Sequence, residues 1–274
     1  MTATTPVDPG AEPIVRSVAH VMGMPISLAL RGRHAADEAG RSAWIEVMAS
    51  LREADLVFST YRPESVISRL GRGEIGPGDC PPEVAEVLAL GERATEQSGG
   101  AFAVRRPGPD GAPVLDPSGV VKGWAAERAY RAARIAEGYL NAGGDLVLTG
   151  PPRSWRIGIE HPADPRGLLT VVAVGTGGIA TSGRAHRGAH LWDPATGRAA
   201  AGRCQATVVG PTLTWADILA TAAAVAGPDR LDRSGWPPGY EVLLAEPDGT
   251  ASVSAGFPAL LADDLPPLRT VELP

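Results

Sequence analysis

Apolar positions in the first half of the chain recur mainly at helical spacing. One amphipathic helix is predicted over residues 37–57, where apolar side chains follow one another at steps of three and four: Trp44, Val47, Met48 and Leu51. A second helix begins at Pro81-Pro82 and ends at Gly99-Gly100, and an alanine-rich third helix covers residues 122–137. Residues 14–30 are predicted to be extended, ending in the apolar/polar alternation of a half-buried strand.

From residue 139 onward, short apolar and β-branched runs indicate strands. They cover residues 146–148, 155–159, 168–174 and 206–209. A final helix is predicted over residues 214–226, with Thr214 as its N-cap and Gly227-Pro228 as its stop, followed by a hairpin over residues 240–254. Helices in the first half and strands in the second, without internal repeats, indicate an α+β fold with mixed or antiparallel sheets.

The composition is that of an ordinary globular protein, with 44% hydrophobic and 20% charged residues among 274. Its 34 glycines and 26 prolines indicate a chain rich in loops. The net charge of −6 argues against a nucleic-acid surface, which needs clustered positive charge. We expect residues 1–13 to form a flexible tail and residues 14–274 to form one domain of two closely packed lobes.

The sequence shows neither a secretory signal nor a membrane-spanning run. Residues 1–13 lack a basic start followed by an apolar stretch, and no run of about 18 apolar residues occurs anywhere. We therefore expect a cytoplasmic protein. The two cysteines, Cys80 and Cys204, are either free thiols or one disulfide, and their spacing does not suggest metal binding.

Lys122 is the one lysine among 25 basic residues, and the other 24 are arginines. An ammonium is a compact charge on a flexible stem, so a planar guanidinium cannot always replace it beside a phosphate or cofactor. Lys122 follows a turn rich in glycine, proline and serine that leads into the third predicted helix. We interpret it as a binding residue, and an ordinary surface lysine is the alternative.

Hydroxyl, imidazole and carboxylate side chains gather between residues 180 and 221. The Thr-Ser-Gly-Arg segment at 181–184 is suited to holding phosphate oxygens. Asp217 and Thr221 lie four positions apart on one face of the last helix, and their oxygens are of the kind that Mg²⁺ binds. On spacing alone, a structural interpretation is the better one: the hydroxyl of Thr221 donates to the carbonyl of Asp217, and Asp217 faces the helix dipole from the first turn.

Two further side chains have alternative interpretations. His190 precedes a tight Asp-Pro turn and is either an imidazole that accepts a proton near neutral pH or one satisfied at a sheet edge. Tyr61 is either a stacking platform or an aromatic residue of the core or rim. Each signal is weak alone, so the argument depends on their occurrence together.

In order along the chain, these segments resemble the FAD:protein FMN transferases, the ApbE-type flavin transferases. The matching segments are Met22-Gly23 and residues 58–65, 99–102, 116–123, 141–145, 180–183, 190–197 and 216–221. The resemblance covers about residues 18–227. It implies an α+β architecture related to the T-fold and an enzyme that transfers the FMN part of FAD to a Ser or Thr hydroxyl of an acceptor protein, releasing AMP.

The resemblance also implies roles for individual residues. Asp217, Thr221 and the backbone carbonyl of Gly119 correspond to Mg²⁺ ligands, and His190 corresponds to the base. The residues expected to contact FAD include those of the phosphate-binding segment. They are Met22, Tyr61, Ala101, Phe102, Ala103, Asp116, Lys122, Thr181, Ser182, Gly183 and Leu191. We expect FAD as substrate, Mg²⁺ as cofactor, and an acceptor flavoprotein with a Ser/Thr flavinylation site as partner.

The chain departs from the family pattern in one segment above all. Ala103-Val104 stands where the family usually has aspartate and proline, and only 13 residues separate Phe102 from Asp116, so a longer segment is missing. The shortening motivates two alternatives, a Mg²⁺-dependent FAD pyrophosphatase that yields FMN and AMP, and a flavin-binding relative without turnover.

Overall fold

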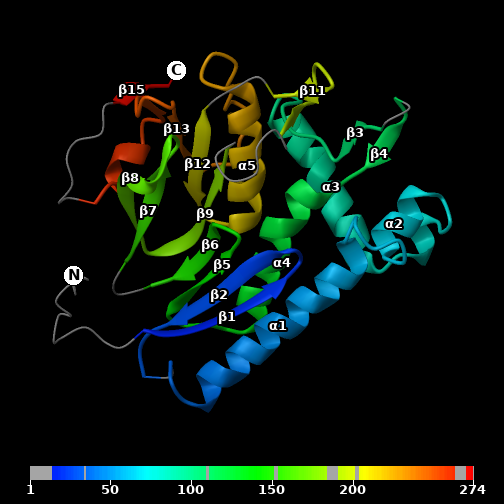
Figure 1. Ribbon diagram of the computed structural model, residues 1–274, viewed down its shortest axis with the longest axis horizontal. Helices are drawn as coiled ribbons and strands as arrows, with labels where there is room; N and C mark the ends of the chain where they lie inside the picture. The colour runs from blue at the N-terminus through cyan, green and yellow to red at the C-terminus, as the bar shows by residue number, and fades with distance from the viewer. Residues whose placement is uncertain are drawn as a thin grey trace.

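A nine-stranded sheet runs through the computed structural model, which describes residues 14–33, 35–108, 111–150, 154–183, 191–200, 204–262 and 270–273 (Figure 1). The tail expected for residues 1–13 lies outside these ranges. In spatial order the strands are β1 (Val15–Val21), β2 (Met24–Leu30), β5 (Gly138–Ala142), β6 (Asp145–Thr149), β9 (Thr176–Ser182), β12 (Gln205–Gly210), β13 (Glu241–Ala245), β14 (Ala251–Val253) and β15 (Thr270–Glu272). Neighbouring strands are antiparallel except β14 and β15, which are parallel.

Helices cover one face of this sheet and a separate hairpin covers the other (Figure 1). The helical layer consists of α1 (Glu38–Phe58), α3 (Pro82–Gln97), α4 (Ser118–Ala132) and α5 (Leu213–Ala226). On the opposite face lie the hairpin of β7 (Trp155–His161) and β8 (Asp164–Val174) and the short 3₁₀ helix η2 (Phe257–Leu260). Smaller elements are α2 (Val66–Gly71), η1 (Pro77–Asp79), and the hairpins β3 (Arg105–Pro107) with β4 (Pro113–Leu115) and β10 (Trp192–Asp193) with β11 (Arg198–Ala199).

Alternation along the strands creates a hydrophobic core on each side of the sheet. Val147 and Val208 pack into the core beneath the helices, whereas their neighbours Leu148 and Val209 pack into the core beneath β7 and β8. This is the period-two pattern of a sheet buried on both faces. The structure confirms the predicted α+β class, and the division into two lobes stays a prediction.

The first predicted helix is confirmed with its boundaries shifted by one residue. Asp37 is the N-cap of α1, and its carboxylate accepts a 2.8 Å hydrogen bond from the amide of Ala39. The third helix was predicted four residues too late, because Asp116 accepts a 3.2 Å hydrogen bond from the amide of Ser118 and so starts α4 there. Arg134, with φ of 48°, follows the end of α4 at Ala132, which removes the predicted extension to residue 137.

The N-cap of the last helix was also predicted wrongly. It is Thr212, whose hydroxyl accepts a 3.4 Å hydrogen bond from the amide of Trp215, and α5 begins at Leu213. Thr214 lies in the first turn, where its amide and hydroxyl both donate to the carboxylate of Glu127 in α4. This contact fixes the start of α5 against α4.

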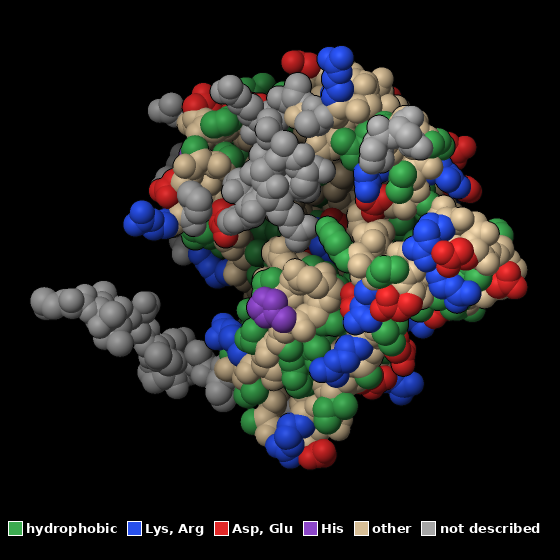
Figure 2. Space-filling model, turned by 45° about the vertical axis from the view of Figure 1, so that its right-hand side comes forward, with side chains coloured by type: hydrophobic (Ala, Val, Ile, Leu, Met, Phe, Trp, Pro, Cys, Tyr) green, Lys and Arg blue, Asp and Glu red, His purple; other side chains and the backbone are tan. Residues whose placement is uncertain are grey.

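Basic and acidic side chains are interspersed on the face shown in Figure 2. Between the end of α1 and the turn after α2, Arg62 pairs with Asp55 at 3.5 Å and with Glu64 at 3.3 Å, and Arg72 pairs with Glu74 at 2.6 Å. Within the described residues, none of the helices combines the length and apolar character needed to cross a bilayer. Both cysteines are free thiols, so the disulfide alternative is excluded.

Candidate active site

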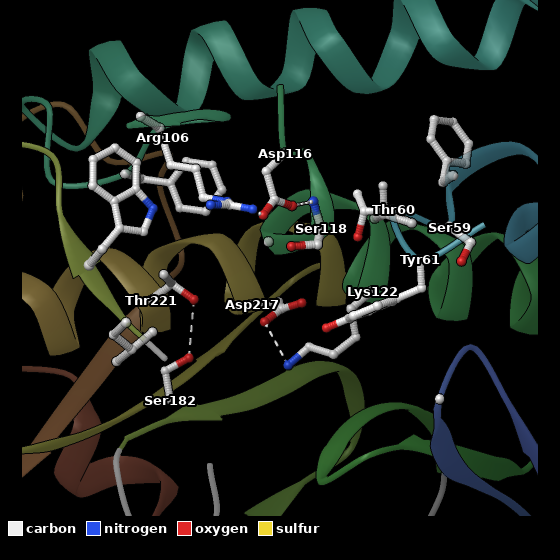
Figure 3. Close-up of a pocket in the computed structure, with 18 of the residues that line it drawn as sticks. Ser59, Thr60, Tyr61, Arg106, Asp116, Ser118, Lys122, Ser182, Asp217 and Thr221 are labelled. Atoms are coloured by element: carbon white, nitrogen blue, oxygen red, sulfur yellow. Dashed lines mark hydrogen bonds and ion pairs between the residues drawn. The ribbon is translucent and has the colours of Figure 1, made fainter. Parts of the chain in front are cut away.

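A cavity of about 1160 Å³ lies where the β1–β2 turn, the segment after α1 and the hairpin β10–β11 meet α4 and α5 (Figure 3). Most of the residues that the sequence singled out line it: Met22, Tyr61, Ala101, Phe102, Ala103, Asp116, Gly119, Lys122, Ser182, Leu191, Asp217 and Thr221. These residues are spread over 200 positions of the sequence, from Met22 to Thr221. A cavity of this size is large enough for a ligand of dinucleotide dimensions.

Two of the expected residues that the structure describes, Thr181 and Gly183, do not line the cavity. Thr181 belongs to the sheet interior, where its amide donates to Oδ1 of Asp145 at 3.0 Å and its hydroxyl lies 2.9 Å from that of Thr207. Gly183 packs against Gln205, since a Cβ at this position would lie 3.3 Å from the Gln205 side chain. His190 falls outside the described residues, as does Arg184.

Lys122 forms ion pairs with two buried carboxylates at the floor of the cavity. Its Nζ lies 3.1 Å from Oδ1 of Asp217 (Figure 3). It also contacts Oδ2 of Asp145. Lys122 comes from the second turn of α4, Asp217 from α5, and Asp145 from the start of β6. Each of these two aspartates is only 1% exposed. A single ammonium is shared by two carboxylates in a desolvated environment, an arrangement in which a second cation nearby would be favourable.

Burial and neighbouring charges shift the pKa values in this cluster. Burial lowers the pKa of Lys122, but the charges of Asp217 and Asp145 outweigh it, and the pKa lies above the ordinary lysine value. Burial raises the pKa of Asp217, the charge of Asp145 raises it further, and Lys122 opposes both. Lys122 is therefore a fixed positive charge at the cavity floor.

Close packing of α4 against its neighbours depends on two glycines. A Cβ at Gly123 would lie 2.9 Å from Cβ of Asp217, and one at Gly119 would lie 2.9 Å from the ring of Phe102. The amide of Gly123 donates a 3.0 Å hydrogen bond to Oδ2 of Asp217. Gly119, Asp217 and Phe102 all line the cavity beside the first turns of α4.

The hydroxyls of Thr221 and Ser182 lie 3.1 Å apart, which joins α5 to the end of β9 (Figure 3). Thr221 lies on the same face of α5 as Asp217, as their spacing predicted. Within the described residues, no cluster of three or more His, Cys, Asp or Glu side chains is arranged to hold a metal ion. A cation here would rely on mixed oxygen donors, namely one carboxylate, one or two hydroxyls and a backbone carbonyl.

Met22 and Gly23 form the two-residue turn between β1 and β2, with φ values of 56° and 70°. Positive φ at both central positions is the geometry of a type I′ hairpin turn. A left-handed backbone is unusual for methionine, and backbone strain of this kind is often found at functional sites. Met22 lines the cavity. Tyr61 is 96% exposed at the cavity lining, which excludes the core interpretation of this aromatic residue.

Several lining residues were not anticipated from the sequence. Arg106 from β3 lines the cavity and pairs with Asp116 at 3.0 Å, and Arg198 and Trp192 line it from the hairpin β10–β11. Asp145 was noted only as the end of a matching segment. A signal for it existed, because an acidic residue after Gly143-Gly144 begins an apolar strand, where a carboxylate needs a partner.

Comparison with known proteins bears on this site. The model of the ApbE family matches residues 22–106 and 109–235. The chain belongs to the ApbE family. No curated protein sequence matches the chain. The family match includes every lining residue described above, from Met22 to Thr221.

Solved structures of ApbE proteins share the fold at low sequence identity. The flavinyl transferase ApbE of Pseudomonas stutzeri is 20% identical, with a TM-score of 0.75 over 93% of this chain and 100% of that chain. The flavin transferase ApbE of Vibrio cholerae is 22% identical, with a TM-score of 0.74 over 91% and 100%. The ApbE protein of Thermotoga maritima is 18% identical, with a TM-score of 0.74 over 92% and 100%. These likenesses establish the α+β architecture across nearly the whole chain.

Proposed function

We propose that this chain transfers the FMN part of FAD to a Ser or Thr hydroxyl of an acceptor protein and releases AMP. Membership of the ApbE family supports transferase chemistry, and two of the similar structures are themselves named flavin or flavinyl transferases. The observation that carries the proposal is the cavity itself. Lys122, Asp217, Thr221 and Gly119 all line this cavity, and so does the exposed Tyr61.

The residues of the cavity floor fit a Mg²⁺ ion. The proposed ligands are the carboxylate of Asp217, the hydroxyl of Thr221 and the carbonyl of Gly119, all of them oxygen donors of the type that this ion prefers. Gly119 lines the cavity together with Asp217 and Thr221, which supports the use of its backbone carbonyl as a ligand. When bound, Mg²⁺ would neutralise charge on the phosphate oxygens.

The proposed chemistry is a displacement at phosphorus. The acceptor hydroxyl attacks the FMN phosphorus of FAD, its proton passes to the imidazole of His190, and the bond to the AMP phosphate breaks with AMP leaving. Lys122 supplies a permanent positive charge near the phosphates, and Tyr61 offers its ring to the isoalloxazine. His190 is proposed from the family resemblance, and the adjoining Leu191 lines the cavity.

Incubation with FAD, Mg²⁺ and short Gly- and Thr-rich acceptor peptides tests the proposal. Mass spectrometry is expected to find covalent FMN on the peptide, and Asp217→Ala is expected to abolish the product while keeping the fold. Asp232→Ala is the control, because this aspartate is exposed and its carboxylate accepts a hydrogen bond from nearby Ser234 in the same loop, outside the cavity lining. Full transfer by the Asp217→Ala variant would refute the metal assignment.

The short hairpin β3–β4 favours a second candidate function. Only five residues connect these strands, so an acceptor protein has less surface on which to dock than a longer connection would offer. AMP released by water in the absence of any acceptor would identify an FAD pyrophosphatase, and tight FAD binding without AMP would identify a non-catalytic relative. His190→Ala should reduce transfer far more than FAD affinity; an equal loss of both would make His190 a binding residue.

A further inference from the structure

Arg230 lies beyond the last helix and contacts two separate parts of the structure. Its guanidinium donates to the carbonyl of Val225 at 2.8 Å and to that of Ala226 at 3.3 Å, both at the C-terminus of α5. The same group lies 3.1 Å from Oδ2 of Asp193 in β10. The last carbonyls of a helix lack intrahelical donors and carry partial negative charge, so a guanidinium is well suited to this position.

Asp193 organises the hairpin β10–β11 from within. Oδ1 accepts a 2.9 Å hydrogen bond from the amide of Ala195, and its carbonyl accepts from the amide of Gly197 at 2.8 Å. Asp193 is only 6% exposed, so its carboxylate is held in one orientation. Oδ2 then faces the guanidinium of Arg230.

This hairpin supplies one wall of the cavity, through Leu191, Trp192, Pro194 and Arg198. Among the described residues, the pair of Asp193 with Arg230 is the one side-chain hydrogen bond or ion pair that joins residues 191–200 to the rest of the structure. Helix α5 contributes to the floor of the cavity through Asp217 and Thr221. Arg230 therefore connects the wall of the cavity to the helix that forms its floor.

We propose that Arg230 is a positioning residue, which holds the hairpin wall against the end of α5 and so sets the width of the cavity for its ligand. The choice of FAD as the ligand rests on the proposed function. The attachment of the hairpin to α5 does not rest on it. A planar guanidinium can satisfy the two carbonyls and the carboxylate together, whereas an ammonium is a point charge that cannot span them.

Hydrogen exchange of the ligand-free protein tests the attachment independently of catalysis. The Arg230→Met variant is expected to exchange the amides of Ala195, Gly197 and Ala200 faster than wild type, while the amides of α5 before its last turn and the melting temperature stay unchanged. Arg128→Met is the matched control, because Arg128 has similar side-chain exposure, 49% against 54%, and pairs with Glu83 away from the cavity. Equal exchange in the two variants would overturn the inference.

Kinetics with FAD then show whether the attachment serves the ligand. Arg230→Met is expected to raise the KM and Kd for FAD between roughly 10- and 100-fold with kcat at saturating FAD nearly unchanged, and Arg230→Lys to recover part of the loss. In the Asp193→Asn background, which keeps the acceptor for Ala195, Arg230→Met should add little. Faster amide exchange in Arg230→Met with an unchanged KM and Kd for FAD would overturn the positioning role. A wild-type protein that binds no FAD would refute the proposed function, but the result of the exchange experiment would still hold.

Discussion

The backbone amide of Gly123 donates a 3.0 Å hydrogen bond to Oδ2 of Asp217, joining α4 to α5 beneath the cavity. The contact is possible because residue 123 has no side chain: a Cβ there would lie 2.9 Å from Cβ of Asp217 and 3.0 Å from the carbonyl oxygen of Leu213. The spacing of the two helices and the orientation of a candidate metal ligand therefore depend on the same glycine.

Gly123→Ala is expected to destabilise the protein although alanine is the better helix former. Helix propensity alone would favour alanine by about 1 kcal/mol, but forcing a methyl group between two packed helices costs about 1–3 kcal/mol. Urea denaturation should show a lower free energy of unfolding, and transfer should fall because Asp217 is displaced. Gly71→Ala, at the end of α2 with only an ordinary 3.9 Å contact, is the control and should be neutral or stabilising. A stabilised Gly123→Ala variant would contradict the packing argument.

Lys122→Met is expected to lower the free energy of unfolding by about 3–5 kcal/mol, because it leaves two buried carboxylates without their cation. Lys122→Arg keeps the charge and should retain more of the stability, although the larger guanidinium should still impair ligand binding. Urea denaturation of both variants at pH 7 measures the difference. Adding Asp145→Asn to Lys122→Met should restore part of the loss, since it removes one of the two like charges. If Lys122→Met were as stable as wild type, the carboxylates would not depend on this ammonium.

The helices could be predicted because their signals are local. The apolar spacing around Val47 and Leu51 needs only one turn of helix to be visible, and α1 follows it with a one-residue shift. β9 was not predicted, because Gly177 and Gly178 interrupt its apolar alternation. A Cβ at Gly178 would lie 2.4 Å from the backbone of Leu213, so the residues that hide the strand from sequence analysis are those that let α5 approach it.

The site was predictable only where its residues share an element. Asp217 and Thr221 share one face of a single helix, so their spacing was sufficient to pair them. Asp145 meets Lys122 through the pairing of β6 within the sheet, 23 residues further along the chain, and no local pattern encodes that contact. The same holds for Arg230 and Asp193, which come together only when the chain has passed through β12 and α5.

The two thiols are expected to differ in reactivity. Burial raises the pKa of Cys204 to about 11, and its Sγ lies 3.9 Å from the carbonyl of Ala224, so it is a neutral thiol enclosed in the core. Cys80 is partly exposed. A thiol reagent such as DTNB at pH 8 should therefore modify only Cys80 in the native protein and both cysteines after denaturation. The Cys80→Ser variant should show no native reaction; rapid native modification of this variant would mean that Cys204 is accessible.

Glu127→Ala is expected to destabilise α5 although Glu127 belongs to α4. Its carboxylate accepts from the amide of Thr214 at 3.0 Å and from the hydroxyl of Thr214, and it pairs with Arg131 at 2.6 Å. Loss of charged hydrogen bonds at a buried helix N-terminus should lower the free energy of unfolding by about 2–3 kcal/mol. Glu127→Gln keeps an acceptor for Thr214 and should lose about half as much. Glu38→Ala, which removes an exposed pair with Arg41, is the control for urea denaturation and should change little. Equal stability of Glu127→Ala and Glu38→Ala would show that α5 keeps its place without this contact.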